Sequence, residues 1–72
     1  MKELDAVKIV KLLKANRPFD GTEGVKRPPH FGDIGAIVHF GKEVCTVECV
    51  DSEGYTVWLA DFLIEELEET YG

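Results

Sequence analysis

The sequence predicts a small, mainly β domain that curls into a five-strand-like, partly open antiparallel β-barrel. The chain has 72 residues, which is enough for one domain, residues 1–72, with a small core. Strand-forming residues recur in short segments after residue 34, and turn residues separate these segments. Ahead of them, Pro28, Pro29 and Gly32 stop regular structure and turn the chain into the first segment.

Residues 4–15 fit two different structures. Lys8, Lys11 and Lys14 recur at every third position, as they would on the polar face of an amphipathic helix. Val7 and Ile9 are β-branched and favour a strand instead. Periodicity alone leaves both alternatives open.

Residues 16–33 are predicted to form a long irregular loop, because prolines and glycines interrupt them repeatedly. Loops of this length in a compact domain are usually functional or disordered. Phe19, Val25 and Phe31 are expected to hold this loop against the barrel, which predicts an ordered loop. Asp33 is expected to accept hydrogen bonds from backbone N–H groups of the turn in which it lies.

Strand-forming segments separated by turns follow this loop. Three strands are predicted, at residues 36–40, 44–50 and 55–60. The turns between them are predicted at residues 40–43 and 51–54, and Gly54 suits the second because glycine adopts a positive φ without strain. In the middle strand Cys45, Val47 and Cys49 share one face, which is typical of a half-buried antiparallel sheet.

A short helical turn is predicted at the C-terminal end, over residues 62–69. Asp61 is expected to cap it. Leu63, Ile64 and Leu67 would form its packed side, while its glutamates would face water. Four carboxylates near the C-terminal end of a helix oppose the helix dipole, so this helix should be short.

Several segments together resemble a known family. They are Leu4-Asp5-Ala6-Val7, Gly32-Asp33-Ile34-Gly35-Ala36-Ile37-Val38, Val47-Glu48-Cys49-Val50-Asp51-Ser52-Glu53-Gly54 and Leu59-Ala60-Asp61. In this order they resemble a family of small bacterial single-domain proteins of unknown function that have an SH3-like β-barrel. The resemblance covers nearly the whole chain. It implies an SH3-like barrel here and a strand over residues 7–13, although the family usually has an aromatic residue where Cys45 and Cys49 stand.

A second, weaker resemblance concerns Arg27-Pro28 and the turn at residues 32–38. These residues are similar to the SH3-like β-subunit domain of nitrile hydratases and their accessory proteins. Such domains are scaffolds that pack on a metal-bearing partner and hold no metal themselves. This likeness implies the same fold, but it supplies no catalytic residue that maps onto this chain.

The cysteines and histidines are not expected to hold a metal. On a strand, Cys45 and Cys49 would lie about 13 Å apart, which is too far for a disulfide between them. They also lack the Cys-x-x-Cys spacing of zinc sites, so they are predicted to be small buried hydrophobic residues. His30 lies in the loop and His39 on a strand, so we expect no shared metal site and no cofactor.

Five residues are candidates for binding a partner: Phe19, His30, Phe31, Tyr55 and Trp58. Tyr55 and Trp58 fall on opposite faces of one predicted strand, so at least one of them should point away from the interior. Trp58 is expected in the core. If it were exposed, it would form an apolar groove with residues of the loop, and such grooves anchor partners. No Ser/His/Asp arrangement stands out, so no catalytic residue is predicted and the protein is not expected to be an enzyme.

Charge is unevenly distributed along the chain. The formal net charge is −6; residues 1–30 hold seven Lys or Arg against four Asp or Glu, and residues 31–72 hold one against ten. An acidic chain argues against nucleic-acid binding, because phosphate contacts need a basic face. No apolar run approaches the roughly 18 residues that span a bilayer, and the N-terminus lacks the apolar core of a signal peptide. We therefore expect a cytoplasmic protein with no membrane partner.

The sequence predicts a non-enzymatic protein-interaction module that can self-associate, with a protein partner of unknown identity. One alternative is an antidote or immunity-type protein whose acidic surface neutralises a toxic basic partner, since complementary charge speeds association. A second alternative is an accessory scaffold subunit of a larger enzyme.

Overall fold

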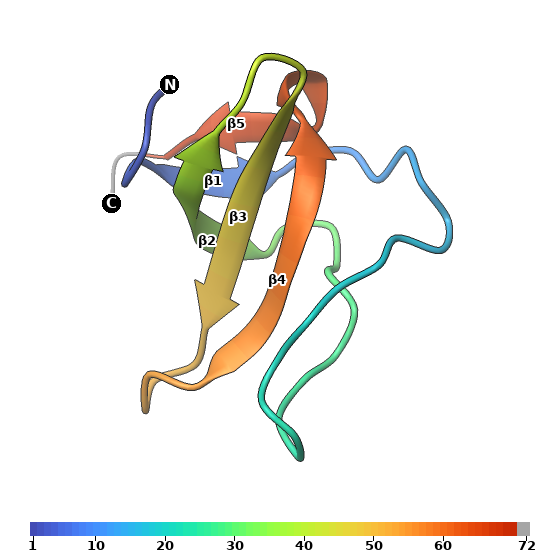
Figure 1. Ribbon diagram of the computed structural model, residues 1–72, viewed down its shortest axis with the longest axis vertical. Helices are drawn as coiled ribbons and strands as arrows, with labels where there is room; N and C mark the ends of the chain where they lie inside the picture. The colour runs from blue at the N-terminus through green and yellow to red at the C-terminus, as the bar shows by residue number, and fades with distance from the viewer. Residues whose placement is uncertain (71–72) are drawn as a thin grey trace.

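The computed structural model describes residues 1–70 as five antiparallel strands in one open sheet, in the spatial order β4-β3-β2-β1-β5. The elements are β1 (Ala6–Ile9), β2 (Ile34–Phe40), β3 (Val44–Val50), β4 (Thr56–Leu63), the 3-10 turn η1 (Ile64–Glu66) and β5 (Leu67–Glu69). In Figure 1, β3 and β4 run along the long axis of the molecule and β1 and β5 lie across it, so the sheet is strongly twisted. The prediction of a mainly β domain is confirmed.

The strand predictions hold with shifted ends. The first element is a strand, but it covers only Ala6–Ile9, whereas the prediction was residues 7–13. The chain turns away from the sheet after Ile9, where the N–H of Val10 bonds to the carbonyl of Glu66. β3 has the predicted bounds, and its alternate residues are buried as predicted. The helical alternative for residues 4–15 is wrong.

Both predicted turns are present. In the turn between β3 and β4, Gly54 has a φ of 87° and its N–H bonds to the carbonyl of Asp51. The Asp51 side chain accepts two further bonds, from the N–H groups of Glu53 and Tyr55. Between β2 and β3, the N–H of Gly41 bonds to the carbonyl of Val44. Local sequence therefore determines these hairpins.

The helical turn predicted over residues 62–69 is wrong for most of its length. β4 continues to Leu63, which pairs with Val44, and a three-residue 3-10 turn then leads directly into β5. Asp61 lies within β4 and caps no helix. The glutamates do not share one wet face, because the side chain of Glu66 is fully buried. Its buried partner comes from the distant loop, so local periodicity could not reveal it.

The core lies on the concave face of the sheet. Its buried apolar residues are Val7, Ile9, Ile37, Cys45, Val47, Cys49, Val57, Trp58, Ala60, Phe62 and Leu67. The rings of Trp58 and Phe62 pack with their centroids 5.4 Å apart at an interplanar angle of 57°. Cys45 and Cys49 are free and buried, as predicted. Burial raises the pKa of both thiols, which keeps them protonated and apolar.

Gly35 allows β2 and β3 to approach closely within this core. A Cβ at this position would lie 2.6 Å from the carbonyl oxygen of Glu48 and 2.8 Å from Cγ1 of Val47. Its φ is not in the left-handed region, so the requirement for glycine here is one of space.

Gly35→Ala should therefore lower the free energy of unfolding by about 2 kcal/mol, because the added methyl group forces backbone apart in a packed core. Urea denaturation followed by the fluorescence of Trp58 measures the change. Ala36→Ser, one position along the same strand, is the control and should cost less than about 0.5 kcal/mol. Equal stability of Gly35→Ala and the parent protein would show that the strands can separate freely.

Candidate functional site

The loop between β1 and β2 follows the outer edge of β4 (Figure 1). Asp20 and Leu59 exchange two backbone hydrogen bonds, of 3.0 and 2.8 Å. The N–H groups of Thr22 and Arg27 bond to the carbonyls of Thr56 and Val57, which precede Leu59 in β4. The loop thus covers part of an edge that would otherwise be open to pairing with another chain.

Two of the three apolar residues expected to hold the loop do so. Phe19 and Val25 pack against the core. Phe31 does not, because its side chain is 70% exposed at the turn before β2. Pro29, which was predicted only as a breaker of regular structure, is buried in its place.

Arg27 and Asp33 fix the second half of the loop. The Arg27 guanidinium donates to both oxygens of Asp33, over 2.7 and 3.0 Å. Asp33 also accepts from the backbone N–H of His30, which confirms the predicted turn bond, and from the indole N–H of Trp58, at 2.9 Å each. One carboxylate therefore joins the loop to the largest side chain of the core.

Arg17 and Glu66 fix the first half of the loop in a similar way. Nη2 of Arg17 lies 2.7 and 2.6 Å from the two carboxylate oxygens of Glu66. The backbone N–H groups of Leu13 and Leu63 donate to the same carboxylate, over 2.8 and 2.9 Å. The side chain of Glu66 is fully buried and that of Arg17 is 6% exposed, so this ion pair is almost dry.

The Arg17 guanidinium is only partly used by this pair. Its Cζ lies 4.2 Å from the centroid of the Phe62 ring, which is a cation–π contact. Its Nε and Nη1 atoms are buried and have no hydrogen-bond partner among the residues that the structure describes. Glu66 is saturated with donors, whereas Arg17 keeps donor groups to spare.

Both carboxyl groups are held in the charged form. Burial favours the protonated form of Asp33, but hydrogen bonds from Arg27, His30 and Trp58 outweigh it and lower the pKa of Asp33 to about 2. Burial acts in the same direction on Glu66, and the bonds from Arg17, Leu13 and Leu63 again lower its pKa below the ordinary value. Both sites are therefore ion pairs at neutral pH.

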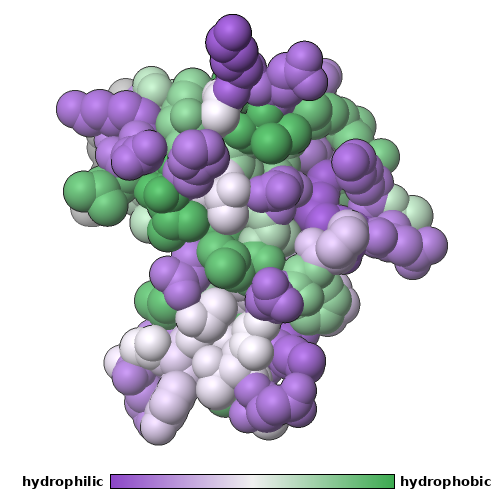
Figure 2. All heavy atoms as spheres, in the orientation of Figure 1, coloured by the Kyte–Doolittle hydropathy of each residue, from purple (hydrophilic) through white to green (hydrophobic). Residues whose placement is uncertain are grey.

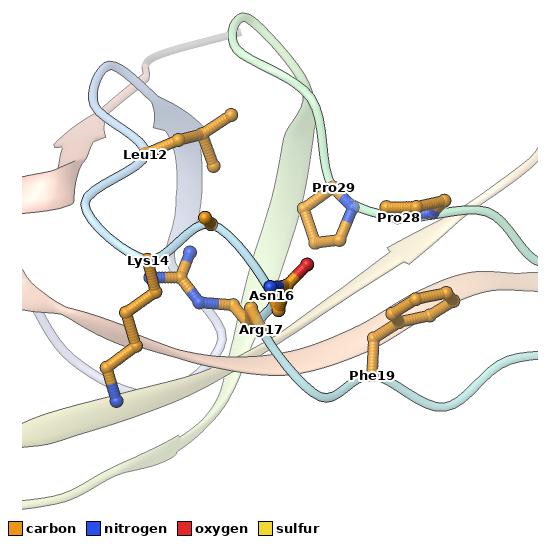
Figure 3. A pocket seen from close by; sticks show the side chains of 8 residues that line it. Leu12, Lys14, Asn16, Arg17, Phe19, Pro28 and Pro29 are labelled. Atoms are coloured by element: carbon orange, nitrogen blue, oxygen red, sulfur yellow. The ribbon is translucent and has the colours of Figure 1, made fainter.

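A groove of about 400 Å³ lies between the two halves of the loop. Its lining residues are Leu12, Lys14, Ala15, Asn16, Arg17, Phe19, Pro28 and Pro29. Figure 3 shows Leu12 and the rings of Phe19, Pro28 and Pro29 around the groove, with the amide of Asn16 directed toward Pro29. Apolar walls with a few polar groups are typical of a ligand site.

The five candidate binding residues are not brought together. Phe19 lines the groove, while His30 and Phe31 are exposed at the turn before β2 and are not among the lining residues. Tyr55 is 49% exposed in the β3–β4 turn. Trp58 is fully buried beneath the loop, as favoured for the core, so the groove that needed an exposed Trp58 does not form.

The sequence interpretation missed most of the groove. Leu12 was assigned to a strand, Pro28 was considered as a breaker and as part of a family resemblance, and Pro29 was considered only as a breaker of regular structure. The sequence did contain one signal. Leu12 is an apolar residue that follows the first strand, and two adjacent prolines, Pro28 and Pro29, come later in the same loop. The position of Arg17 in the lining is fixed by Glu66, 49 residues further along the chain, so the loop sequence alone does not reveal it.

Other exposed apolar residues are scattered over the molecule. On the face drawn in Figure 2, hydrophobic residues lie mainly in the upper half and the middle, with hydrophilic residues between and around them. Exposed examples on the strands and turns are Leu4, Ile34, Val38, Val50 and Tyr55. Single exposed apolar residues are normal, so the groove is distinguished by its concave shape.

Residues 1–70 contain no cluster of three or more His, Cys, Asp or Glu side chains arranged to hold a metal ion. Within the same residues no helix has the length and apolar character to cross a membrane. Comparison of the chain with protein families, curated proteins and solved structures found no match.

Glu66→Gln should lower the free energy of unfolding by about 3–5 kcal/mol, because it leaves the charge of Arg17 buried and unpaired. Such a loss can unfold most molecules of so small a domain. The measurement is urea denaturation followed by Trp58 fluorescence.

Glu65→Gln, the exposed neighbour, is the matched control and should change stability by less than about 0.5 kcal/mol. The double variant Arg17→Met with Glu66→Leu removes both charges and should recover much of the loss. Equal stability of Glu66→Gln and Glu65→Gln would contradict the buried ion pair.

Asp33 should make the protein less stable in acid. Its folded pKa, about 2, lies below its ordinary 3.8, so its stabilisation is complete above roughly pH 4 and is lost as the pH falls toward 2. Asp33→Asn should cost about 2 kcal/mol at pH 6, and this difference from the parent protein should vanish near pH 2. Urea denaturation at a series of pH values measures it.

Glu53→Gln, in the exposed β3–β4 turn, serves as the control and should leave the pH dependence of the parent protein unchanged. A constant difference between Asp33→Asn and the parent from pH 6 to pH 2 would rule out this role for the Asp33 carboxylate.

Proposed function

We propose that this chain is a non-enzymatic protein-interaction module, built as a small SH3-like, partly open β-barrel, that binds a segment of a partner protein in its loop groove. The observation that carries the proposal is the groove itself, an apolar hollow on a loop fixed at one end by the buried Arg17–Glu66 pair and at the other by the partly buried Arg27–Asp33 pair. A binding site that is already formed before the partner arrives loses little conformational entropy on binding. This favours binding of a partner segment in the groove.

The SH3-like assignment rests on the strand order and the connections. β1 lies between β2 and β5, so the first and last strands pair, and a long loop separates β1 from β2. A 3-10 turn joins β4 to β5. These features are consistent with a sheet that bends toward a barrel.

The groove favours this function over the antidote-type alternative. That alternative needs carboxylates at the contact surface in order to attract a basic enzyme. None of the eight residues that line the groove carries a carboxylate, and Lys14 borders it. An accessory scaffold subunit would use the same apolar groove and is one form of the proposed function.

Leu12→Asp tests the proposal, because it places a charge in the apolar wall at a position that is already 44% exposed. Purified parent and variant proteins are immobilised and incubated with extract of the source cell, and retained proteins are compared by mass spectrometry. A partner that uses the groove should bind the parent protein and be lost, by at least about tenfold, with Leu12→Asp.

Val50→Asp is the matched control, since Val50 is 51% exposed on β3 and is not among the residues lining the groove. It should retain the same partner as the parent protein. If every retained protein binds the parent and Leu12→Asp equally, the groove is not the interaction surface.

A further inference from the structure

The charges around the groove have the opposite sign to those of the whole protein. The chain has a net charge of −6. Lys14 and Arg17 line the groove, and no lining residue carries a carboxylate. Glu66 neutralises the charge of Arg17, and the structure records no ion pair of Lys14 within residues 1–70. The groove therefore sits beside a local excess of positive charge.

Arg17 also has buried hydrogen-bond donors that need an acceptor. It is a lining residue, its side chain is 94% buried, and its Nε and Nη1 donors have no partner among the described residues. A buried donor without a partner is costly, by about 1–3 kcal/mol, and a carboxylate is the acceptor that guanidinium groups bind best. Glu66 cannot supply the missing bonds in this geometry, because both of its oxygens already face Nη2.

The segment that covers Arg17 has few anchors of its own. Residues 12–16 are exposed, and the bond from the Leu13 N–H to Glu66 is the one hydrogen bond that the structure records from their backbone. Figure 3 shows the Arg17 guanidinium beneath this segment, beside the groove rather than in its centre. A small shift of residues 14–16 would bring its free donors within reach of a ligand.

We infer that the groove is selective for an acidic peptide, in which an apolar side chain packs against Phe19, Pro28 and Pro29 and a neighbouring carboxylate binds Arg17 and Lys14. This inference rests on the proposed function and names its ligand class. The volume of about 400 Å³ accommodates one or two apolar side chains. The peptide carboxylate accepts hydrogen bonds from Arg17 donors that are otherwise unpaired. It therefore increases affinity and also favours acidic over neutral peptides.

Three synthetic tetrapeptides test the inference: acetyl-Ala-Glu-Leu-Ala-amide and the counterparts with Gln or Lys in place of Glu. Each is titrated into isotope-labelled full-length protein, and binding is followed by the shifts of backbone amide NMR signals. The Glu peptide should bind about fivefold more tightly than the Gln peptide, and the Lys peptide should bind most weakly. Shifts should gather at residues 12–19 and at His30, which follows the two prolines. The preference should shrink in 1 M salt, because salt screens charges at the protein surface.

Lys14→Gln should reduce the preference for Glu over Gln without unfolding the protein, since Lys14 is exposed. Lys2→Gln removes an exposed lysine from the N-terminal segment, on the opposite side of the molecule from the loop, and should keep the full preference.

The outcomes separate the two proposals. If the Glu and Gln peptides bind equally at the groove, or the Lys peptide binds best, selection for a carboxylate is wrong while the groove remains a binding site. If none of the peptides shifts signals of the groove at millimolar concentration, both the ligand class and the groove as a peptide site are wrong. Binding of the Glu peptide that Lys14→Gln and Lys2→Gln weaken equally would reflect general charge attraction and would also overturn the inference.

Discussion

The carboxylate of Glu66 joins two parts of the chain that are distant in sequence, the β1–β2 loop and the segment that runs from the end of β4 into η1. It receives the Arg17 guanidinium and the N–H of Leu13 from the first loop, and the N–H of Leu63 from the end of β4. The backbone carbonyl of Glu66 accepts hydrogen bonds from the N–H groups of Val10 and Lys11. The buried side chain of Glu66 therefore holds η1 against the first half of the loop, and this half supplies one wall of the groove.

A buried ion pair of this kind does not necessarily increase stability. The cost of removing two charges from water offsets much of their attraction, so a well-packed apolar pair can be equally stable. The pair instead excludes alternatives, because any other path of the loop would leave a charge buried without a partner. The cation–π contact between Arg17 and Phe62 also attaches this part of the loop to the aromatic core. Asp33 does the same at the other end of the loop through Arg27 and Trp58.

The groove and the core share structural elements. A domain of this length has little apolar area to bury, so residues outside the sheet must contribute to its core. Phe19 packs against the core and also lines the groove, and Pro29 is buried while it forms part of the opposite wall. Stability and ligand recognition consequently depend on some of the same side chains. Substitutions at the exposed positions Leu12 and Lys14 can alter recognition with less effect on folding.

The sequence by itself determined the strands β2, β3 and β4 and the turns between them. The alternation of buried and exposed residues in β3, the Gly54 turn and the turn bond of Asp33 all follow from neighbours in the chain, and each was predictable from a few residues. The packing of Phe19 and Val25 against the core was also predictable, because both are apolar residues in a polar segment. Phe31 shows the limit of that reasoning, since it is an apolar residue of the same loop and is 70% exposed.

Only the tertiary structure decided which side chains meet in the groove and what happens after β4. The run of glutamates from residue 65 onwards has the composition of a wet helical surface, yet Glu66 faces inward because Arg17, 49 residues earlier, lies there to bind it. The physical reason is that burial of a charge depends on a partner brought near by the whole fold. Period and propensity describe neighbours within one turn or one strand, and they contain no information about such a partner.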